Sequence, residues 1–469
     1  PIKPVLAKVR AAKTRKELIK LMYDLDEKGY NTFPVGFGMT TDAMNSSRYI
    51  IGVSQSGLGL DPEYYTQPNE QQKAVVAAYK SLKNDYLKMV GNAPAVAKKK
   101  MEEAFALENR IAKVSYDQVK SRDPQANYHP MTWEQLLKDY PGIDWNYILK
   151  IAGYPNNGGK VDVGQPEPVH EVEKILATAP LDQLKDYMEL AVISSSAGML
   201  SDAFSNRKFE YTKVAYGVQQ QQPRWKRALS FVQGIMGEAV GKLYVQKYFP
   251  ESSKERMIQL VKNLQSAFAQ RIGENTWMTA ATKAKALEKL QAFDIKIGYP
   301  DKWQNMDSVF VIDEAKSLLD NVKNVQEAAS KYIISKRWGK PVDKKLWHMT
   351  PQTVNAYYDP STNSINFPAA ILQPPFFDPE VDDAANYGAI GAVIGHEMSH
   401  GFDDQGCQFD KEGNMKNWWT DEDKKNYDAR TKVLVDWFNQ QEVIPGLKVN
   451  GEKTLGENIG DNGGLNVAY

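Results

Sequence analysis

Cysteine is nearly absent from this sequence, because Cys407 is the only one among 469 residues. An internal disulfide is therefore excluded, and a lone cysteine is more simply a small, partly buried hydrophobic residue than a nucleophile. Net charge is also absent, since Lys plus Arg and Asp plus Glu number 58 each. A chain without a basic excess is not expected to bind nucleic acid or an anionic membrane surface. No run of about 18 apolar residues occurs, so we expect no transmembrane segment in this chain.

Histidine is scarce as well, and its distribution is informative. Two of the five histidines, His396 and His400, stand four residues apart in the sequence H-E-M-S-H. A helix is predicted here, because an apolar run rich in small residues precedes them and Gly401 follows where a helix would end. Four residues make a little over one helical turn, so both imidazoles project from the same face. Each can then bind one zinc ion at about 2.0 to 2.1 Å, while Glu397 points at a water molecule on the metal.

This pattern indicates peptide hydrolysis, although a second explanation is open. A buried helix with two hydrogen-bonded histidines and a surface glutamate would give the same letters without a metal. The scarcity of histidine elsewhere in the chain favours the metal site. The metzincin pattern H-E-x-x-H-x-x-G-x-x-H is excluded, since Asp403 and Gly406 occupy its glycine and final histidine positions.

A catalytic zinc usually has three protein ligands, so a third ligand must lie elsewhere in the sequence. Glu457 and Asp461 are four residues apart and would share one face of a helix. One of these carboxylates can complete the metal site, while the other accepts the free N–H of a ligating imidazole. Taken alone, this spacing more often marks a solvated acidic helix face.

A β-hairpin is predicted between residues 355 and 367. Its first strand is Asn355 to Tyr358, its turn is D-P-S-T-N over 359–363, and its return strand covers 364–367. An edge strand here could pair with an extended peptide through main-chain hydrogen bonds, with the Asn355 amide adding a donor and an acceptor. A purely structural hairpin is the simpler explanation of these residues taken alone.

Motifs along nearly the whole chain carry a family resemblance. The main blocks are N-A-Y-Y (355–358), F-P-A-A-I-L-Q-P-P-F-F (367–377), V-I-G-H-E-M-S-H-G-F-D-D (393–404) and G-E-N-I-G-D-N-G-G-L-N (456–466). Shorter blocks upstream are P-R-W (223–225), W-M-T-A-A-T-K-x-K-A (277–286) and K-I-G-Y-P (296–300). In this order they resemble the neprilysin family of zinc endopeptidases, peptidase family M13, and most closely its bacterial PepO-type oligopeptidases. One departure is Gly460, which stands where alanine is commoner in that family.

The resemblance implies a role for particular residues within these blocks. The ligands of one Zn²⁺ ion would be His396, His400 and Glu457. The catalytic residues would be Glu397, as general base, and Asp461, as the partner that orients His396.

Substrate contacts are implied for five further residues: Asn355, Ala356, Ile371, Phe376 and Val393. The first two would hold the peptide. The last three would line an apolar pocket for the residue just after the scissile bond, and plain core positions explain them equally well.

The fold class expected is mainly α with a smaller α+β part. Helical periodicity dominates the first 320 residues, for example in the core face formed by 75, 79, 82, 86 and 90, with similar stripes over 231–248 and 257–272. We expect residues 1–320 to form a mostly helical, substrate-restricting domain and 321–469 to form part of a thermolysin-like catalytic domain. The resemblance implies that the two enclose a central chamber that admits short peptides and rejects folded proteins.

The function expected is therefore a zinc-dependent endopeptidase that cuts short peptides on the amino side of hydrophobic residues. The alternatives are a non-catalytic zinc- or peptide-binding relative, or a fragment that is inactive without its missing C-terminal segment. The intact Glu397 argues against a binding module, which has no need of a general base.

Two parts of the family pattern are not found in this sequence. They are the opening acidic-aromatic block, and the oxyanion histidine and substrate arginine that follow the third-ligand helix. We expect the chain to be an internal piece that functions with the remaining N- and C-terminal fragments of its polypeptide docked. Because animal neprilysins are rich in disulfides, the single cysteine favours a bacterial member, in the cell envelope, the periplasm or the medium.

Overall fold

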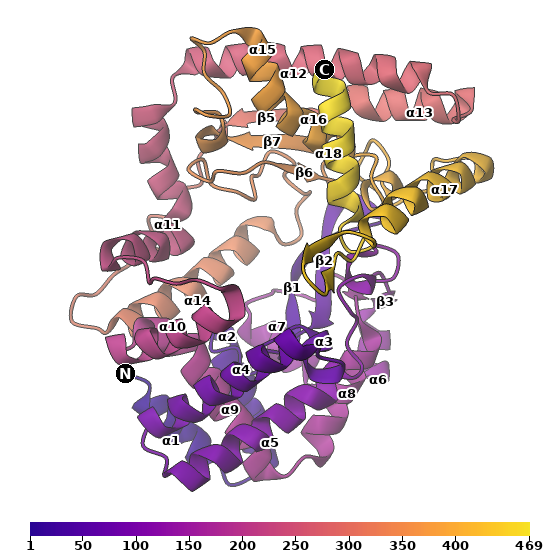
Figure 1. The fold of residues 1–469 in the computed structure, drawn as a ribbon. Coiled ribbons are helices and arrows are strands. Elements are labelled where there is room, and N and C mark those ends of the chain that lie inside the picture. Colours follow the sequence, from indigo (N-terminus) through magenta and orange to yellow (C-terminus); the bar gives the residue numbers. More distant parts are fainter.

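Helices make up most of the chain, and three small sheets lie among them (Figure 1). A computed structural model describes the backbone of residues 1–469 and the side chains of all of them except residue 252. From the N-terminus to residue 216 the elements are α1 (Lys3–Ala11), α2 (Arg15–Glu27), β1 (Val35–Asp42), β2 (Asn45–Gln55), α3 (Pro62–Thr66), α4 (Glu70–Met89), α5 (Pro94–Ala112), η1 (Lys120–Arg122), β3 (Pro130–Thr132), α6 (Trp133–Asp139), α7 (Trp145–Ile151), β4 (Lys160–Val163), α8 (Pro166–Thr178), α9 (Leu181–Ser196), η2 (Ala197–Met199) and α10 (Asp202–Tyr216).

The remaining elements carry the sequence blocks described above. They are α11 (Arg224–Tyr248), α12 (Glu251–Glu274), α13 (Ala280–Gln291), β5 (Asp294–Gly298), α14 (Leu318–Arg337), β6 (Tyr357–Asp359), β7 (Ser364–Pro368), η3 (Ala369–Ile371), α15 (Asp383–Asn386), the π-helical turn η4 (Tyr387–Gly391), α16 (Ala392–His400), η5 (Gly406–Gln408), α17 (Asp421–Phe438), β8 (Glu442–Ile444), β9 (Leu447–Lys448) and α18 (Leu455–Ala468).

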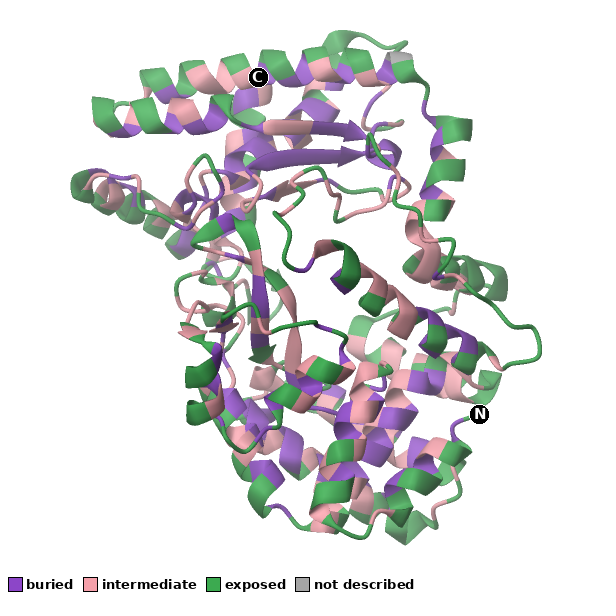
Figure 2. Cartoon of the chain, turned by 180° about the vertical axis from the view of Figure 1, so that it is seen from behind, coloured by how far each residue is buried: buried purple, intermediate pink, exposed green. Residues whose placement is uncertain are grey.

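Two large hydrophobic cores divide the molecule into a first and a second lobe. The first core is built from residues between 2 and 197, together with Leu319, Ile334 and Trp338. The second is built from residues between 245 and 297, residues between 356 and 398, and Val467. Figure 1 shows the first lobe at the bottom and the second at the top, with α11 running between them on the left. Figure 2 shows buried residues gathered inside the first lobe and along β5 and β7 of the second.

The cores do not separate at residue 320, so the expected boundary between the two domains needs correction. Helices α12 and α13 and strand β5 lie before that residue but belong to the second core. Helix α14 begins at Leu318 but packs into the first core through Leu319 and Ile334. The chain thus passes from the first lobe to the second, back to the first, and again to the second. Composition along the sequence could not show this, because helices with similar apolar stripes serve both cores.

The apolar stripes predicted from sequence have different outcomes. On α4, the side chains of Val75, Tyr79, Leu82 and Tyr86 are buried as expected. On α11 the stripe over 231–248 is not a core face, since only Gly241 and Val245 are buried there and Leu243 is 68% exposed. That helix is kinked at Met236 and runs between the lobes, and only its C-terminal end, at Val245, packs into the second core.

The sheets place two features that matter for the site. In the first lobe the strand order is β1-β2-β4-β3, and the tip of the β1–β2 hairpin reaches the second lobe, where the Met415 N–H donates to the Ala43 carbonyl at 2.6 Å. In the second lobe the order is β5-β7-β6, with β5 and β7 parallel and β6 and β7 antiparallel. The predicted hairpin is therefore present, and β6 lies at the edge of its sheet.

Candidate metal centre

Helix α16 presents the H-E-x-x-H residues in its last two turns. It continues the π-helical turn η4 and ends at His400, as the glycine at 401 predicted. Gly401 keeps right-handed helical angles, and the reason for a glycine is space: a Cβ there would stand 2.7 Å from the Phe293 ring. The backbone just after the helix therefore packs closely against the second core.

Helices α16 and α18 pack closely because glycines from both helices line their contact. A Cβ on Gly395 would lie 2.9 Å from the backbone of Gly464, and a Cβ on Gly464 would lie 2.5 Å from the Ala392 carbonyl oxygen. Gly460 faces the His396 ring, where a Cβ would come within 2.8 Å of Nδ1. With no side chains between them, the two helix backbones touch, and this contact carries the α18 carboxylates to the histidines.

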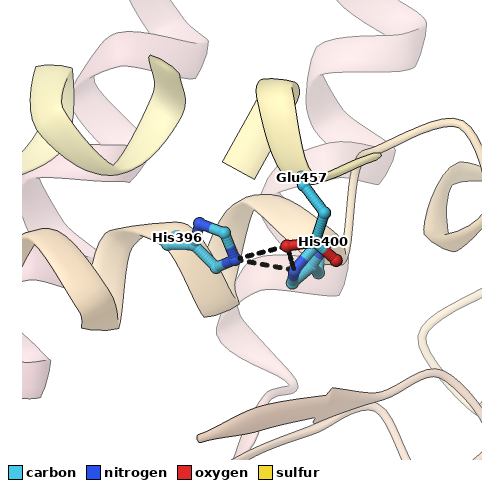
Figure 3. Close-up of side chains that lie close together, drawn as sticks. All are labelled: His396, His400 and Glu457. Atoms are coloured by element: carbon cyan, nitrogen blue, oxygen red, sulfur yellow. Dashed lines mark hydrogen bonds and ion pairs between the residues drawn. The ribbon is translucent and has the colours of Figure 1, made fainter. Parts of the chain in front are cut away.

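The three residues expected to bind zinc lie together, as Figure 3 shows. The two Nε2 atoms are 2.9 Å apart, and the Glu457 Oε2 atom is 3.3 Å from Nε2 of His396 and 3.8 Å from Nε2 of His400. One donor atom from each residue lies within 4.8 Å of the others. Among the described residues, this is the set of histidine, cysteine and carboxylate groups with the geometry to hold a metal ion.

Carboxylates hold the outer nitrogen of each imidazole. Asp461 Oδ1 is 3.0 Å from Nδ1 of His396, the contact expected from the sequence. Asp403 Oδ2 is 2.7 Å from Nδ1 of His400, and sequence reasoning missed this role. The available signal was its position three residues beyond the second histidine, just past the helix end. Asp403 is itself fixed, because its Oδ1 accepts from the N–H groups of Gln405 and Gly406 at 2.9 and 2.6 Å.

This arrangement fits a bound cation. A carboxylate is only an acceptor, so each Nδ1 carries the hydrogen and each Nε2 presents a lone pair. Two such lone pairs and a carboxylate oxygen then converge on one point with no hydrogen between them. A zinc ion takes this set of nitrogen and oxygen ligands, with a further position left for water or substrate.

Glu397 lies beside these ligands, in a different environment. Its side chain is buried, with 6% of the residue exposed. Burial raises the pKa of Glu397 to about 7, with a further increase from Glu457 and an opposing effect from His400. Burial lowers the pKa of His400, but its contact with Asp403 outweighs this and leaves the pKa above its ordinary value. A carboxyl group with a pKa near neutrality is suited to exchange protons in both directions.

A cavity of about 350 Å³ opens at the cluster. Asn355 and Ala356 line it, together with both histidines, Glu397 and Glu457. The two residues precede β6, which begins at Tyr357, so the expected strand starts two residues later than predicted. The shift places Asn355 outside the strand pairing and among the residues that line the cavity.

The three residues expected to form an apolar pocket do not line this cavity. Ile371 is buried in the second core with 5% exposure, while Phe376 and Val393 are partly buried against the same core. Both explanations predict such packing against the core, so the pocket role of these three residues stays a prediction. The sequence could not distinguish the two, because a pocket wall and a core face require the same apolar side chains.

The other histidines and the cysteine lie apart from the metal cluster. His129 contacts the Val163 carbonyl, His170 stacks on Tyr140, and His348 contacts Asp359. Cys407 is buried, and burial raises the pKa of its thiol to about 12, which agrees with an inert hydrophobic residue.

Comparison with known proteins agrees with this geometry. Two sequence models described as peptidase family M13 match the chain, one over residues 1–300 and the other over residues 355–469. The chain belongs to peptidase family M13. Among its relatives, the neutral endopeptidase of Lactobacillus helveticus is 33% identical over 440 residues, which are 94% of this chain and 67% of the relative. Across the curated relatives the chain spans between 53% and 67% of their length.

Solved structures of family M13 share the fold. The Mycobacterium tuberculosis zinc metalloprotease Zmp1 in complex with an inhibitor matches with a TM-score of 0.94 at 40% identity, over 100% of this chain and 72% of that one. In its open state Zmp1 matches with a TM-score of 0.76. PepO of Lactobacillus rhamnosis matches with a TM-score of 0.92 at 27% identity, over 100% of this chain and 74% of that one. The fold is therefore that of the M13 peptidases, a helical part combined with a thermolysin-like part.

Membrane insertion was not expected from the sequence. Within the described residues, no helix combines the length and the apolar character that crossing a bilayer requires.

Proposed function

We propose that the protein is a zinc-dependent endopeptidase, and that His396, His400 and Glu457 hold the metal. One observation carries the proposal: three ligand atoms converge within 4.8 Å, and carboxylates hold the outer nitrogens of both imidazoles. Membership of a metallopeptidase family supports it. Glu397 beside the cluster distinguishes a hydrolytic site from a structural zinc site, whose four ligands leave no role for a base.

The chain's own residues account for the proton transfers that hydrolysis needs. When held by His396, His400 and Glu457, zinc would supply Lewis acidity, which polarises a carbonyl group and lowers the pKa of a water molecule. Glu397 accepts the proton of the attacking water and delivers it to the leaving amine, a cycle suited to a pKa of about 7. Asp461 and Asp403 keep the two imidazoles oriented with Nε2 toward the metal.

The substrate we propose is an extended peptide lying along β6. This strand is at the edge of the sheet β5-β7-β6, so its outer side has main-chain groups free to pair with a peptide. Asn355 and Ala356 stand at the start of this edge and line the cavity beside the metal ligands. The Asn355 amide adds one donor and one acceptor for the peptide backbone.

Three finer features remain part of the proposal. Cleavage is on the amino side of a hydrophobic residue, for which the family resemblance assigns Ile371, Phe376 and Val393 as an apolar pocket. The two lobes restrict access to short peptides. The compartment is the bacterial cell envelope, the periplasm or the medium.

The test is Glu397→Gln in the complete protein, with zinc content and peptide turnover both measured. We expect one zinc per site to be retained and turnover to be lost, because Glu397 acts on water and is not a ligand. His400→Ala should lose the metal, and Glu380→Gln, which changes an exposed carboxylate, should leave both properties unchanged. Loss of zinc from Glu397→Gln, or near-normal turnover by that variant, would disprove the assignment.

A further inference from the structure

Arg122 is a residue of the first lobe that lines the metal-site cavity. Every other described residue that lines this cavity belongs to the second lobe. Arg122 ends the short helix η1. Asn127 holds this loop together, because its amide donates to the carbonyls of Lys120 and Asp123 at 2.8 Å each. The Asn127 Oδ1 atom also accepts from the Gln165 amide, and this contact ties the loop to the first lobe. The guanidinium therefore projects from one lobe into the site of the other.

The guanidinium contacts two separate segments of the second lobe. On one side it donates to the carbonyls of Lys453 and Glu452, the latter at 3.3 Å, in the turn that leads into α18. On the other side it lies 3.5 Å from Asp404 Oδ2, in the loop that follows α16. With the Gln405 amide oxygen turned toward it, that oxygen accepts from Nε and Nη2, both at 2.7 Å. One planar group thus joins the two segments.

Each segment holds a part of the metal site. Glu457, the third ligand, lies in the first turn of α18, four residues after Lys453. Asp403, the partner of His400, directly precedes Asp404. The fit is tight at Gly456, where a Cβ would lie 2.8 Å from Arg122 Nη2, 2.9 Å from Asp403 Oδ2 and 3.0 Å from Asp404 Oδ1. A glycine is needed at this point because the three charged groups meet there.

The positive charge of Arg122 also offsets the repulsion between two neighbouring carboxylates. Asp403 and Asp404 are adjacent carboxylates, and Asp404 Oδ1 is buried without a hydrogen-bond partner. Burial and the neighbouring Asp403 raise the pKa of Asp404 to about 6, and Arg122 opposes that rise. Without the guanidinium, two close carboxylates would repel each other beside the loop that orients His400.

We propose that Arg122 is a positioning residue for the metal centre: it makes the alignment of Glu457 and Asp403 depend on the first lobe being seated against the second. The proposal rests on the proposed function, since it requires that the cluster binds zinc. It assigns no contact between Arg122 and the reacting atoms. Metal affinity and lobe association are thereby linked through one side chain.

The test compares zinc affinity in the complete wild-type protein and its Arg122→Ala variant, by competition with a chelator. We expect the dissociation constant to rise by about 10- to 100-fold, the usual effect of removing groups that orient metal ligands. Arg122→Lys should fall between the two, because a lysine keeps the charge but cannot reach both segments with a planar fork. The absorption spectrum of the Co²⁺-substituted proteins reports ligand geometry independently of turnover.

A matched control separates this effect from a general loosening of the lobes. Ser46→Ala removes a different contact between the lobes, the hydrogen bond from Ser46 Oγ to the Glu412 carbonyl at 2.7 Å. It should leave zinc affinity and the Co²⁺ spectrum unchanged. The midpoint of thermal unfolding, measured without metal, shows whether each variant folds. If Arg122→Ala does not fold, the comparison uses Arg122→Lys instead.

The outcomes distinguish this inference from the proposed function. If the wild-type protein binds no zinc, the proposed function fails. If the wild-type protein binds zinc and folded Arg122→Ala binds it equally well with the same Co²⁺ spectrum, the positioning role is wrong. An equal loss of affinity in Ser46→Ala would also overturn it, because any contact between the lobes would then suffice.

Discussion

The two metal-site imidazoles differ in how firmly their outer nitrogens are held. The Asp403 side chain is 7% exposed and accepts three hydrogen bonds, whereas the Asp461 side chain is 85% exposed and accepts one from His396. A water molecule can replace an exposed acceptor at small cost, but a buried donor left without a partner has no substitute. His400 is therefore the more rigid ligand.

We accordingly expect Asp403→Ala to weaken zinc binding more than Asp461→Ala. Both should fall within a loss of about 10- to 100-fold, with Asp461→Ala near the lower limit. Dissociation constants of the complete protein, measured by chelator competition at one pH, give the comparison. Equal losses, or a larger loss for Asp461→Ala, would contradict the ranking, and an unchanged affinity in Asp461→Ala would mean that it does not orient His396.

Lys289 is a second informative residue, because it is buried and outside the metal cluster. Its Nζ donates to the carbonyls of Gly406 and Phe409 at 2.6 and 2.7 Å, which fixes the loop that contains Asp403. Burial lowers the pKa of Lys289 to about 7 from 10.5. Between these two values the unfolded chain holds a proton that the folded chain lacks, so the free energy of unfolding rises with pH across this window.

The Lys289→Met variant should lose that rise in stability between about pH 7 and 10. It should also be less stable by about 1 to 3 kcal/mol per carbonyl left unpaired. Urea unfolding at several pH values measures both effects. Lys285→Met, which changes an exposed lysine on the same helix α13, is the control and should retain the pH dependence. If the free energy of unfolding of Lys289→Met still rises with pH across this window, the rise belongs to another titratable group.

At the scale of elements, the contact between α16 and α18 builds the site. The helices meet backbone to backbone because glycines lie at 395 on one and at 460 and 464 on the other. Helical periodicity predicts which face of its own helix each ligand occupies. It did not give the distance between the helices, which depends on the absence of side chains at their contact.

Gly395→Ala should therefore separate the helices and weaken zinc binding. The new methyl group would stand 2.9 Å from the Gly464 backbone, which cannot move aside as a flexible side chain can. Overpacking of this kind costs about 1 to 3 kcal/mol of stability. Gly388→Ala is the control, because a Cβ there has no atom within 4 Å. The measurements are the zinc affinity and the thermal unfolding of both variants. Unchanged zinc affinity in Gly395→Ala would contradict the prediction and show that the helix contact can relax.

The whole molecule is two lobes joined at a few places. The hairpin β1–β2 touches the loop near Met415, and Arg122 touches the segments around the metal ligands. The structure agrees more closely with inhibitor-bound Zmp1 than with its open state, as the TM-scores of 0.94 and 0.76 show. The lobes therefore stand in the arrangement of the inhibitor complex, and the metal site faces the first lobe across the cavity.

The proposed restriction of substrates to short peptides by the two lobes gives a prediction for the complete enzyme. Cleavage of a peptide library, mapped by mass spectrometry, should occur mainly before Leu, Ile, Phe and similar residues, with folded proteins resistant. The preference should be broad, since one methylene contact in a hydrophobic specificity pocket is worth only about 1 to 3 kcal/mol. Cleavage before Lys or Arg as the main product, or rapid digestion of a stable globular protein, would contradict it.

The sequence by itself determined what local geometry fixes. The four-residue spacings of His396 and His400, and of Glu457 and Asp461, set those side chains on single helix faces, since a helix repeats every 3.6 residues. The turn residues 359–363 likewise predicted the hairpin, with its strand start misplaced by two residues.

Only the tertiary structure decided which distant segments meet. It placed the Asp403 carboxylate against Nδ1 of His400 and brought Arg122 of the first lobe to the turn before α18. It also placed α14 in a different core from its sequence neighbours. It also packed Ile371, Phe376 and Val393 against the second core, and these residues are not among those that line the metal cavity. Spacing along a chain fixes positions within a turn or two of helix, whereas contacts between segments hundreds of residues apart depend on how whole faces pack.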